Sequence, residues 1–393
     1  MFKKLKEYDV SNKRVFLRLD LNVPVKEGKI KDDSRITAAL PTIRYLLERN
    51  ARVVAASHLG RPKNGPAPEF SLAPVAKRLA ELLPGTDVVF AGDVVGDDAF
   101  SKASALKEGE LLLLENLRFE TGETKGDEEL AAKIRKFGDV YVTDAFGAVH
   151  RAHASVFQAP KLFDVVLAGF LIEKEIQYLK ENLEKPERPY FALLGGAKVS
   201  DKIPILKSLV EKVDGIAIAG GMAYTFLYAR GEKVGRSILE TEMVGTATAI
   251  MKRAAERGIP FLLPVDHVIA SSMEDPVPTE SAKIDDNSSA FDIGPKTIAL
   301  FAAEIKKAKT IVWNGPMGVF EKEQFRKGTV EIAKAVADTG AVKIVGGGDS
   351  VSAIKVAGVE NRITHISTGG GASLELIAGD KLPGVEILYE KGQ

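Results

Sequence analysis

The sequence predicts an α/β protein made of two units, each built around a parallel β-sheet. Short β-rich runs alternate with helical patterns along the chain, which is typical of βαβ units. The 393 residues exceed the roughly 100–200 residues of an ordinary domain. The alternation also breaks off after Gly169 and restarts beyond Pro189, which indicates a second sheet of similar size.

The first unit, residues 1–169, accounts for the earlier β-rich runs and helical patterns. Strands are expected at Val15–Leu19, Arg52–Ala56, Leu111–Leu114 and Tyr141–Thr143, and helices at Ile36–Glu48 and Leu72–Leu83. Ser34 is expected to cap the first of these helices. The acidic stretch Glu120–Glu129 reads as a solvated loop that leads into a helix.

A helix is expected to connect the two units over residues 170–185. Phe170–Glu184 has apolar residues at helical spacing, and the proline-rich run Pro186–Pro189 that follows cannot continue a helix. The second unit then spans residues 186–371. Its strands are expected near Phe191–Leu194, Ile216–Ala219, Phe261–Leu263, Ile311–Trp313 and Ile344–Val345.

Composition narrows the range of partners. The chain has 54 basic and 54 acidic residues, so it does not resemble a protein that binds nucleic acid or an anionic membrane. An anion site must therefore be a local concentration of cations. The absence of cysteine excludes disulfides, thiolate metal sites and cysteine nucleophiles. No apolar stretch follows the N-terminal lysines, and Val165–Ile172 is too short to span a bilayer, so we expect a cytoplasmic protein.

Polar residues stand directly after the apolar runs of the first unit, where open α/β sheets bind ligands. These residues are Asp20, Asn22, His58, Arg61, Arg118 and Arg151, and Arg35 adds a cation near a helix start. Each residue alone is compatible with a surface charge or a structural ion pair. Their equivalent topological positions instead favour arginines that bind a phosphate and a carboxylate, with Asp20 and Asn22 holding a hydroxyl.

The segment His150–His153 allows a metal interpretation, because histidine ligates zinc through either ring nitrogen. We reject it, since the chain has only five histidines and no cysteine. A role in proton donation or anion contact and a purely structural role both remain open.

Glycine-rich turns follow strands in the second unit. They are Gly195–Lys202, Gly346–Ser350 and Gly369–Gly371, accompanied by Trp313–Glu321. Neither the P-loop spacing nor the dinucleotide-binding fingerprint is present. A single such turn often serves only close packing. Together they favour a nucleotide site in which main-chain amides and Asp349 position phosphates and a hydrated Mg²⁺.

Long ordered motifs across the whole chain resemble the phosphoglycerate kinase family. They include Arg14–Pro24, Ser57–Pro62, Ala145–His153 and the glycine segments above. The resemblance implies two Rossmann-like lobes separated by a cleft and joined by the interdomain helix. It also implies that the tail 372–393 folds back onto the first lobe, with 3-phosphoglycerate bound on the N-terminal lobe and Mg-nucleotide on the C-terminal one.

The resemblance also assigns roles to matching positions. The glycerate substrate would be bound by Asp20, Asn22, Arg35, His58, Arg61, Arg118, Arg151 and His153. The catalytic positions would be Arg35, Lys198, Gly348 and Gly371. The nucleotide would be bound by Gly196, Ala197, Lys198, Lys202, Gly220, Gly221, Gly294, Asn314, Pro316, Glu321, Gly347, Gly348, Asp349 and Ser350. Asp349 would also orient Mg²⁺. His267 departs from the family pattern, which leaves the wall of the nucleotide pocket in question.

The expected activity is reversible transfer of a phosphoryl group between 1,3-bisphosphoglycerate and ADP, which gives 3-phosphoglycerate and ATP. The transfer would be direct and in line, after closure at hinges near Gly169, Pro186 and Thr368. We expect a monomer with small-molecule partners only. The alternatives are a two-lobed binding protein without catalysis and a dehydrogenase, although the second lacks its dinucleotide fingerprint.

Overall fold

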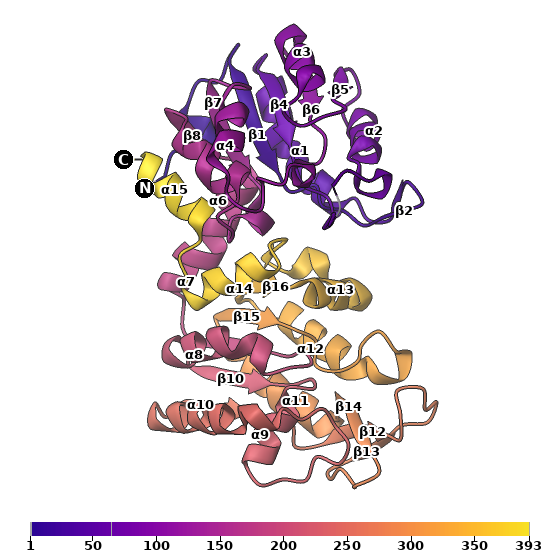
Figure 1. Ribbon diagram of the computed structural model, residues 1–393. Helices are drawn as coiled ribbons and strands as arrows, with labels where there is room; N and C mark the ends of the chain where they lie inside the picture. Colours follow the sequence, from indigo (N-terminus) through magenta and orange to yellow (C-terminus); the bar gives the residue numbers. More distant parts are fainter. Residues whose placement is uncertain (1, 64, 393) are drawn as a thin grey trace. The chain divides into compact units, whose positions relative to one another are not determined.

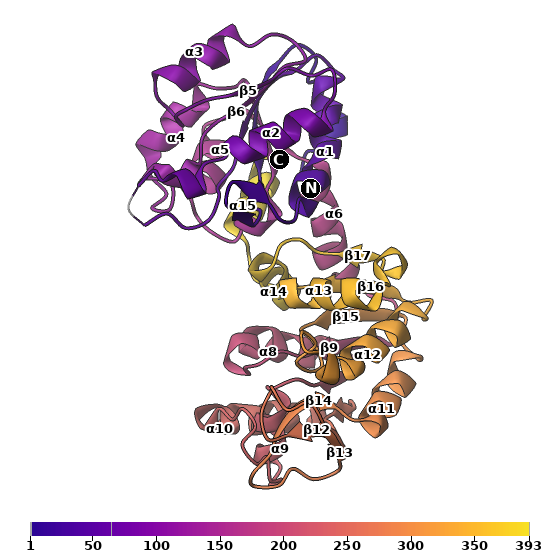
Figure 2. The same cartoon turned by 90° about the vertical axis from the view of Figure 1, so that its right-hand side faces the viewer.

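The chain forms two compact units in the computed structural model, which describes residues 2–63 and 65–392. Unit 1 combines the chain up to Gln177 with the segment from Lys381 onward, and unit 2 runs from Tyr178 to Asp380. Figures 1 and 2 show the ribbon from two sides. Each unit is a parallel sheet with helices packed on it, so the predicted α/β class with two parallel sheets is confirmed.

The sheet of unit 1 has six parallel strands in the order β5-β6-β4-β1-β7-β8. Its strands are β1 (Arg14–Leu19), β4 (Arg52–Ala56), β5 (Val88–Phe90), β6 (Leu111–Leu113), β7 (Val140–Asp144) and β8 (Val165–Ala168). Its α-helices before the interdomain stretch are α1 (Ser34–Leu47), α2 (Ala73–Leu82), α3 (Asp97–Ala105), α4 (Glu128–Arg135) and α5 (Ala159–Lys161). A short antiparallel hairpin, β2 (Val25–Lys26) and β3 (Lys29–Ile30), was not predicted.

Strand β1 runs through the middle of this sheet and is buried on both faces. Val15, Leu17 and Leu19 pack with α1 and α2 in one core cluster. Phe16 points to the opposite face, where its ring stacks on Phe137 and Tyr141. Two-sided burial explains why the strand reads as a nearly continuous apolar run in the sequence.

The start of α1 differs from the prediction. Ser34 is the first helical residue, Asp33 holds the capping position, and no side-chain capping bond is formed there. The Ser34 amide donates instead to Asp32 Oδ1 at 2.8 Å. The expectation that Ser34 caps the helix is therefore wrong, because Asp32 satisfies the amide from two residues back.

The C-terminal helix α15 (Pro383–Gly392) belongs to unit 1 and contacts β8, as the yellow helix beside the N-terminus in Figure 1 shows. The Tyr389 ring meets the Phe2 ring edge-on at 5.4 Å. The preceding helix α14 (Gly371–Ala378) lies in unit 2, where it packs on α8 (Ile203–Lys212). The return to unit 1 thus begins at Lys381, whereas the sequence placed it near Ala372.

A continuous helical stretch carries the chain from unit 1 into unit 2. It consists of α6 (Phe170–Ile176), a π-helical turn at Gln177–Glu181 and α7 (Asn182–Glu184). Its first turn is fixed within unit 1. The amide of Phe170 donates to Thr42 Oγ1 at 3.0 Å, and the amide of Ile172 donates to Asp144 Oδ1 at 3.0 Å.

The main sheet of unit 2 also has six parallel strands, in the order β11-β10-β9-β15-β16-β17. They are β9 (Tyr190–Leu194), β10 (Gly215–Ile218), β11 (Phe261–Leu262), β15 (Thr310–Asn314), β16 (Val342–Gly346) and β17 (His365–Ile366). Its further α-helices are α9 (Ala223–Ala229), α10 (Val244–Glu256), α11 (Pro295–Ile305), α12 (Lys327–Ala337) and α13 (Gly348–Ala357). The five predicted strands are present, and the two-residue strand β17 was not predicted.

A second, antiparallel sheet in unit 2 was not predicted. Its order is β13-β12-β14, formed by β12 (His267–Ala270), β13 (Thr279–Ser281) and β14 (Ser289–Ile293). Figures 1 and 2 show it beside α9 and α11. Strand β14 carries residues that line the pocket described below, so this sheet matters for the candidate site.

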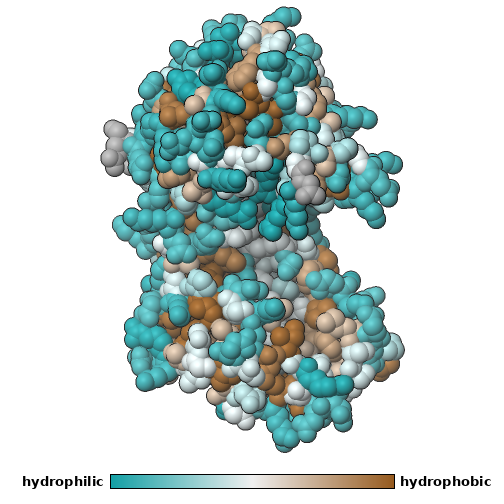
Figure 3. Space-filling view, in the orientation of Figure 1, coloured by the Kyte–Doolittle hydropathy of each residue, from teal (hydrophilic) through white to brown (hydrophobic). Residues whose placement is uncertain are grey.

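Some hydrophobic side chains are exposed on the surface of the protein. In the view of Figure 3, hydrophilic residues cover most of the visible surface, and smaller hydrophobic patches appear on both units. Two of the exposed hydrophobic residues of unit 2, Ile238 and Met273, line the pocket described below. Among the described helices, none combines the length and the apolar character needed to cross a bilayer.

Candidate active site

The candidate anion site of unit 1 lies where four neighbouring parallel strands end. Asp20 and Asn22 follow β1, His58 and Arg61 follow β4, Arg118 follows β6, and Arg151 follows β7. These strands are adjacent in the order β6-β4-β1-β7, so their carboxyl ends meet at one edge of the sheet. Topology therefore brings together residues that are more than a hundred positions apart in the sequence.

Direct contacts connect the loops that follow these strands. Arg35 Nη1 lies 2.7 Å from Asp20 Oδ2, and Asn22 Oδ1 accepts from the Gly60 amide at 2.8 Å. The Gly60 carbonyl in turn accepts from Arg118 Nη1 at 2.5 Å. The loops after β1, β4 and β6 are thus fixed to one another through a single glycine.

The cations of this cluster raise the local positive potential. Burial, followed by the charges of the neighbouring Arg151, Arg18 and Arg61, lowers the pKa of Arg118 to about 10. Arg118 Nε is buried and has no hydrogen-bond partner among the described residues. Arg61 itself is exposed and joins the cluster electrostatically. Guanidinium ions held this close repel one another, and a bound anion would relieve that repulsion.

The two histidines of the His150–His153 segment lie inside this cationic cluster. His150 Nε2 accepts from Arg151 Nε at 3.0 Å, and burial lowers the pKa of His150. Burial and then Arg18 and Arg118 lower the pKa of His153 to about 4. Both rings are consequently neutral near pH 7, which suits hydrogen bonding to an anion better than charge pairing with it.

Two residues of this site were missed in the sequence. Arg18, inside β1, and Glu123, inside the acidic stretch Glu120–Glu129, are both fully buried. The interpretation of that stretch as solvated is therefore wrong for Glu123, which accepts from the amide and the hydroxyl of Ser155 at 2.9 and 2.5 Å. Arg18 could have indicated this, because a charged residue within a strand that is buried on both faces needs a buried partner of opposite charge.

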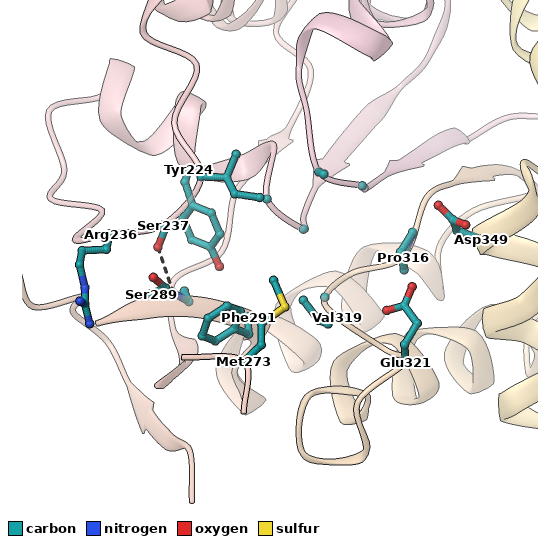
Figure 4. A pocket seen from close by; sticks show the side chains of 17 residues that line it. Tyr224, Arg236, Ser237, Met273, Ser289, Phe291, Pro316, Val319, Glu321 and Asp349 are labelled. Atoms are coloured by element: carbon teal, nitrogen blue, oxygen red, sulfur yellow. Dashed lines mark hydrogen bonds between the residues drawn. The ribbon is translucent and has the colours of Figure 1, made fainter. Parts of the chain in front are cut away.

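Unit 2 contains a pocket of about 370 Å³ at the carboxyl ends of its strands. Its lining residues come from the loops after β9, β10, β12, β15 and α9, from strand β14 and from the starts of α9 and α13. They are Gly196, Ala197, Gly220, Gly221, Tyr224, Arg236, Ser237, Ile238, Met273, Ser289, Ala290, Phe291, Pro316, Gly318, Val319, Glu321 and Asp349. In Figure 4 the carboxylates of Glu321 and Asp349 lie at one side, and Tyr224, Met273 and Phe291 lie toward the other. Tyr224, Met273 and Phe291 thus give the pocket an apolar part away from the two carboxylates, and Arg236, Ser237 and Ser289 border that part.

Glycines are required where these loops cross. A Cβ on Gly195 would lie 2.0 Å from the Pro316 carbonyl oxygen, which no side chain tolerates. The crossing is closed by main-chain bonds, because the Gly196 amide donates to the Pro316 carbonyl at 3.1 Å and the Gly220 amide donates to the Met317 carbonyl at 2.9 Å. The pocket wall is thus largely main chain, which lets a ligand approach amide groups closely.

A polar network adjoins this pocket at the start of α13. Lys202 Nζ donates to Asn314 Oδ1, and Asn314 Nδ2 donates to the Gly346 carbonyl at 2.6 Å. Ser350 Oγ accepts from the Gly315 amide at 2.6 Å. Burial lowers the pKa of Lys202, and the nearby Asp349 opposes that shift. The network brings a lysine, an asparagine and a helix N-terminus together beside Asp349.

Other residues assigned by the family resemblance lie outside the pocket lining. Lys198 is exposed, and its charge acts on Glu240, whose carboxylate accepts from the amides of Val199 and Ser200 at 2.5 and 3.1 Å. Gly294 packs against the Asp266 carboxyl group. Gly347 adjoins Asn314, while Gly348 and Gly371 are the exposed first residues of α13 and α14.

Asp349 is the residue best placed to hold a metal ion. Its carboxylate is exposed at the pocket and makes no hydrogen bond or ion pair to any residue that the structure describes. Mg²⁺ usually takes one or two carboxylates and completes its shell with phosphate oxygens and water. Within residues 2–63 and 65–392, no group of three or more His, Cys, Asp or Glu side chains is arranged to hold a metal. One free carboxylate beside a phosphate-sized space fits Mg²⁺ carried by a nucleotide.

His267 stands behind the pocket wall. Its side chain is buried in β12, and its ring centroid lies 5.7 Å from that of Tyr224, which lines the pocket. His267 Nδ1 has no hydrogen-bond partner among the described residues, and burial lowers the pKa of the ring. His267, which departs from the family pattern, therefore contacts a residue of the pocket wall and does not line the pocket itself.

Comparison with known proteins agrees with this architecture. The family model described as phosphoglycerate kinase matches residues 5–380. Curated phosphoglycerate kinases of Clostridium botulinum (strain Alaska E43) and Clostridium perfringens (strain ATCC 13124) are each 48% identical over 99% of this chain and 99% of their own length.

Solved structures extend the match to three dimensions. The phosphoglycerate kinase of Coxiella burnetii superposes with a TM-score of 0.92 at 41% identity, and that of Pyrococcus horikoshii OT3 with 0.86 at 36%, each covering 100% of both chains. None of these relatives favours the alternative of a binding protein without catalysis. The chain therefore belongs to the phosphoglycerate kinase family, the phosphotransferases that interconvert 1,3-bisphosphoglycerate plus ADP with 3-phosphoglycerate plus ATP.

Proposed function

We propose that the arginine cluster of unit 1 binds 3-phosphoglycerate and 1,3-bisphosphoglycerate, and that the pocket of unit 2 binds ADP and ATP. The glycerate would be held by Asp20, Asn22, Arg35, His58, Arg61, Arg118, Arg151 and His153. The observation that carries this assignment is that Arg61, Arg118 and Arg151 follow adjacent parallel strands at one edge of the sheet, where Arg118 Nε is buried without a hydrogen-bond partner among the described residues. So much positive charge in one place is costly for a folded protein unless an anion occupies it.

The nucleotide would bind with its base in the apolar part of the pocket and its phosphates toward α13. Gly220, Gly221, Tyr224 and Glu321 line the pocket, and the Glu321 carboxylate would accept hydrogen bonds from the ribose hydroxyls. The phosphates would meet Lys202, the start of α13 and Ser350. Asp349 and the phosphate oxygens would hold Mg²⁺, which supplies charge neutralisation for the transferred group.

The protein contributes placement and charge cancellation to the transfer. Two like charges about 4 Å apart repel by roughly 4 kcal/mol at an effective dielectric constant near 20. Arg35 and Lys198 would offset this repulsion at the moving phosphoryl group, and the main chain at Gly348 and Gly371 would approach it closely. No side chain is needed as a nucleophile, since the substrate carboxylate and the nucleotide react in line.

Transfer also requires the two substrates to meet, although each is assigned to a different unit. We therefore propose a closing motion that excludes water, which would otherwise hydrolyse the acyl phosphate. The segments near Gly169, Pro186 and Thr368 are the candidate hinges. We further propose that the protein acts in the cytoplasm as a monomer whose partners are these small molecules, with no nucleic acid and no membrane.

A coupled assay with 3-phosphoglycerate and MgATP tests this assignment. Lys198→Ala should lower kcat by about two orders of magnitude and leave the thermal unfolding midpoint unchanged, because Lys198 is exposed. Arg118→Met should instead raise KM for 3-phosphoglycerate and leave KM for MgATP unchanged. Normal turnover of the Lys198→Ala enzyme would refute the role of that lysine. Binding of both ligands by the wild-type protein without turnover would revive the non-catalytic alternative.

A further inference from the structure

Arg18 occupies an unusual place for a charged residue. It lies inside β1, paired in register with Ala56 of β4 and Thr143 of β7, and its side chain is completely buried. A guanidinium group withdrawn from water must be compensated by hydrogen bonds and by a counter-charge. Neither the family roles carried over above nor the proposed substrate contacts give it a function.

The hydrogen bonds of Arg18 direct its guanidinium group toward His58. Its Nε donates to Ser155 Oγ at 2.9 Å, and its Nη1 donates to the carbonyl of Leu19. Its Nη2 lies 3.3 Å from His58 Nδ1. Two edges of the planar group are therefore fixed, and the third position faces a ring nitrogen of a proposed substrate ligand.

Glu123 supplies the counter-charge. Its Oε1 lies 4.0 Å from Arg18 Nη2, and the side chain is as completely buried as that of Arg18. Ser155 joins the two, because its Oγ accepts from Arg18 Nε and donates to Glu123 Oε1 at 2.5 Å. Burial raises the pKa of Glu123, while Arg18 and the two bonds from Ser155 oppose that rise. The three residues thus form one buried unit.

The contact with His58 fixes where the imidazole proton resides. Arginine has only donors, so His58 Nδ1 must accept in this pair and carry no hydrogen. A neutral ring then holds its proton on Nε2. Burial, followed by the charges of Arg18, Arg118, Arg35 and His153, lowers the pKa of His58 well below its ordinary value and keeps the ring neutral.

The opposite edge of the His58 ring remains available. The residue is 5% exposed, and Nε2 makes no hydrogen bond to any residue that the structure describes. The neighbouring backbone is fixed on both sides, since Ser57 Oγ accepts from the Leu21 amide at 2.8 Å and Asn116 Oδ1 accepts from the Leu59 amide at 3.1 Å. The Nε2–H group therefore has a defined direction.

We infer that Arg18 is a positioning residue: held by Ser155 and Glu123, it selects the His58 tautomer that presents Nε2–H to an anionic oxygen of the glycerate substrate. This inference rests on the proposed role of His58 as a substrate ligand. With the other tautomer, Nε2 would present a lone pair to the substrate oxygen. A hydrogen bond would then be replaced by repulsion.

The tautomer can be measured without substrate. In ¹⁵N-labelled wild-type protein, long-range ¹H–¹⁵N spectra at pH 7 should show His58 with a protonated Nε2 and an unprotonated Nδ1. His58→Gln assigns the signal by its loss. The same spectrum of Arg18→Lys should show a mixture of tautomers, because lysine keeps the charge but loses the planar fork. A wild-type His58 that is protonated on Nδ1, or on both nitrogens, overturns the inference.

Kinetics provide the second readout. Ser155→Ala removes the hydroxyl that holds Arg18, so KM for 3-phosphoglycerate should rise roughly tenfold while kcat changes less than about twofold. Ser155→Thr keeps the hydroxyl and should restore KM. Ser104→Ala is the control for loss of a serine hydroxyl, since Ser104 is exposed on α3 and its Oγ donates to the Phe100 carbonyl of the same helix. An unchanged KM in both Ser155→Ala and Arg18→Lys contradicts the inference.

The two proposals fail in different ways. If His58→Gln leaves KM for 3-phosphoglycerate unchanged, His58 does not contact the substrate and the proposed function loses that residue. The NMR result for Arg18 stands or falls independently of it. Should Arg18→Lys fail to fold, as circular dichroism would show, the wild-type tautomer and the Ser155→Ala kinetics still decide the inference.

Discussion

Alanine in place of Gly348 or Gly371 should separate catalysis from folding. Each glycine is the first residue of its helix, so its amide has no intrahelical acceptor, and a Cβ built on either meets no heavy atom within 4 Å. Neither residue has a positive φ. Folding alone therefore does not require glycine at either position, and alanine should leave stability unchanged or raise it by up to about 1 kcal/mol. The reason for glycine that we propose is the close approach of the transferred phosphoryl group to the main chain.

We expect kcat of Gly348→Ala and Gly371→Ala to fall at least tenfold, or about 1.4 kcal/mol in the barrier, in the coupled assay with 3-phosphoglycerate and MgATP. The matched control is Gly245→Ala in α10, where a Cβ also meets nothing within 4 Å. That variant should gain similar stability in urea unfolding and keep full activity. If Gly348→Ala and Gly371→Ala are as active as Gly245→Ala, the main chain at these helix starts does not contact the reacting group.

Three further outcomes can be measured on stability. Gly195→Ala should lower the free energy of unfolding by roughly 1–3 kcal/mol, because its Cβ would lie 2.0 Å from the Pro316 carbonyl oxygen; a urea midpoint equal to wild type contradicts this. Burial raises the pKa of Asp292 to about 7 in the folded protein, so its contribution to stability is complete below pH 4 and is lost as the pH rises toward 7. Asp292→Asn should accordingly flatten the decline of unfolding free energy between pH 4 and 7, and an unchanged slope argues against a raised pKa. His267→Val removes a buried ring nitrogen without a partner and should keep or slightly raise the thermal midpoint, whereas a loss above about 2 kcal/mol would mean that the ring packs against Tyr224 more favourably than its geometry indicates.

The parallel sheets could be predicted because a strand that is buried on both faces gives a recognisable run of apolar residues in the sequence. Strands β1, β7 and β15 each contain three consecutive apolar residues, and nearly all of their positions are buried. The antiparallel sheet β13-β12-β14 left no such trace. Its strand β13, Thr279–Ser281, is short and largely exposed, so neither alternation nor an apolar run marks it.

The arginines could be assigned to one site because each follows a strand of the same parallel sheet. Residues after adjacent parallel strands share an edge of the sheet, whatever their separation in sequence. The same rule is silent about Glu123, which reaches the site from a turn beyond Arg118 and is buried by its bonds to Ser155. Acidic residues in a polar stretch are usually exposed to solvent. Glu123 is buried because the buried cation Arg18 lies beside it.

Arg18 and Glu123 show how that omission could be repaired from the sequence. An arginine within an apolar parallel strand cannot reach water from the middle of the sheet, so the chain must supply a carboxylate and further acceptors nearby. The acidic residues that follow β6 are the candidates, because β6 and β1 flank β4 in the same sheet. A charged residue inside a buried strand, such as Arg18, thus predicts that an acidic residue of another segment is buried beside it. In the role we propose for it, the pair orients His58 and leaves contact with the substrate to that ring.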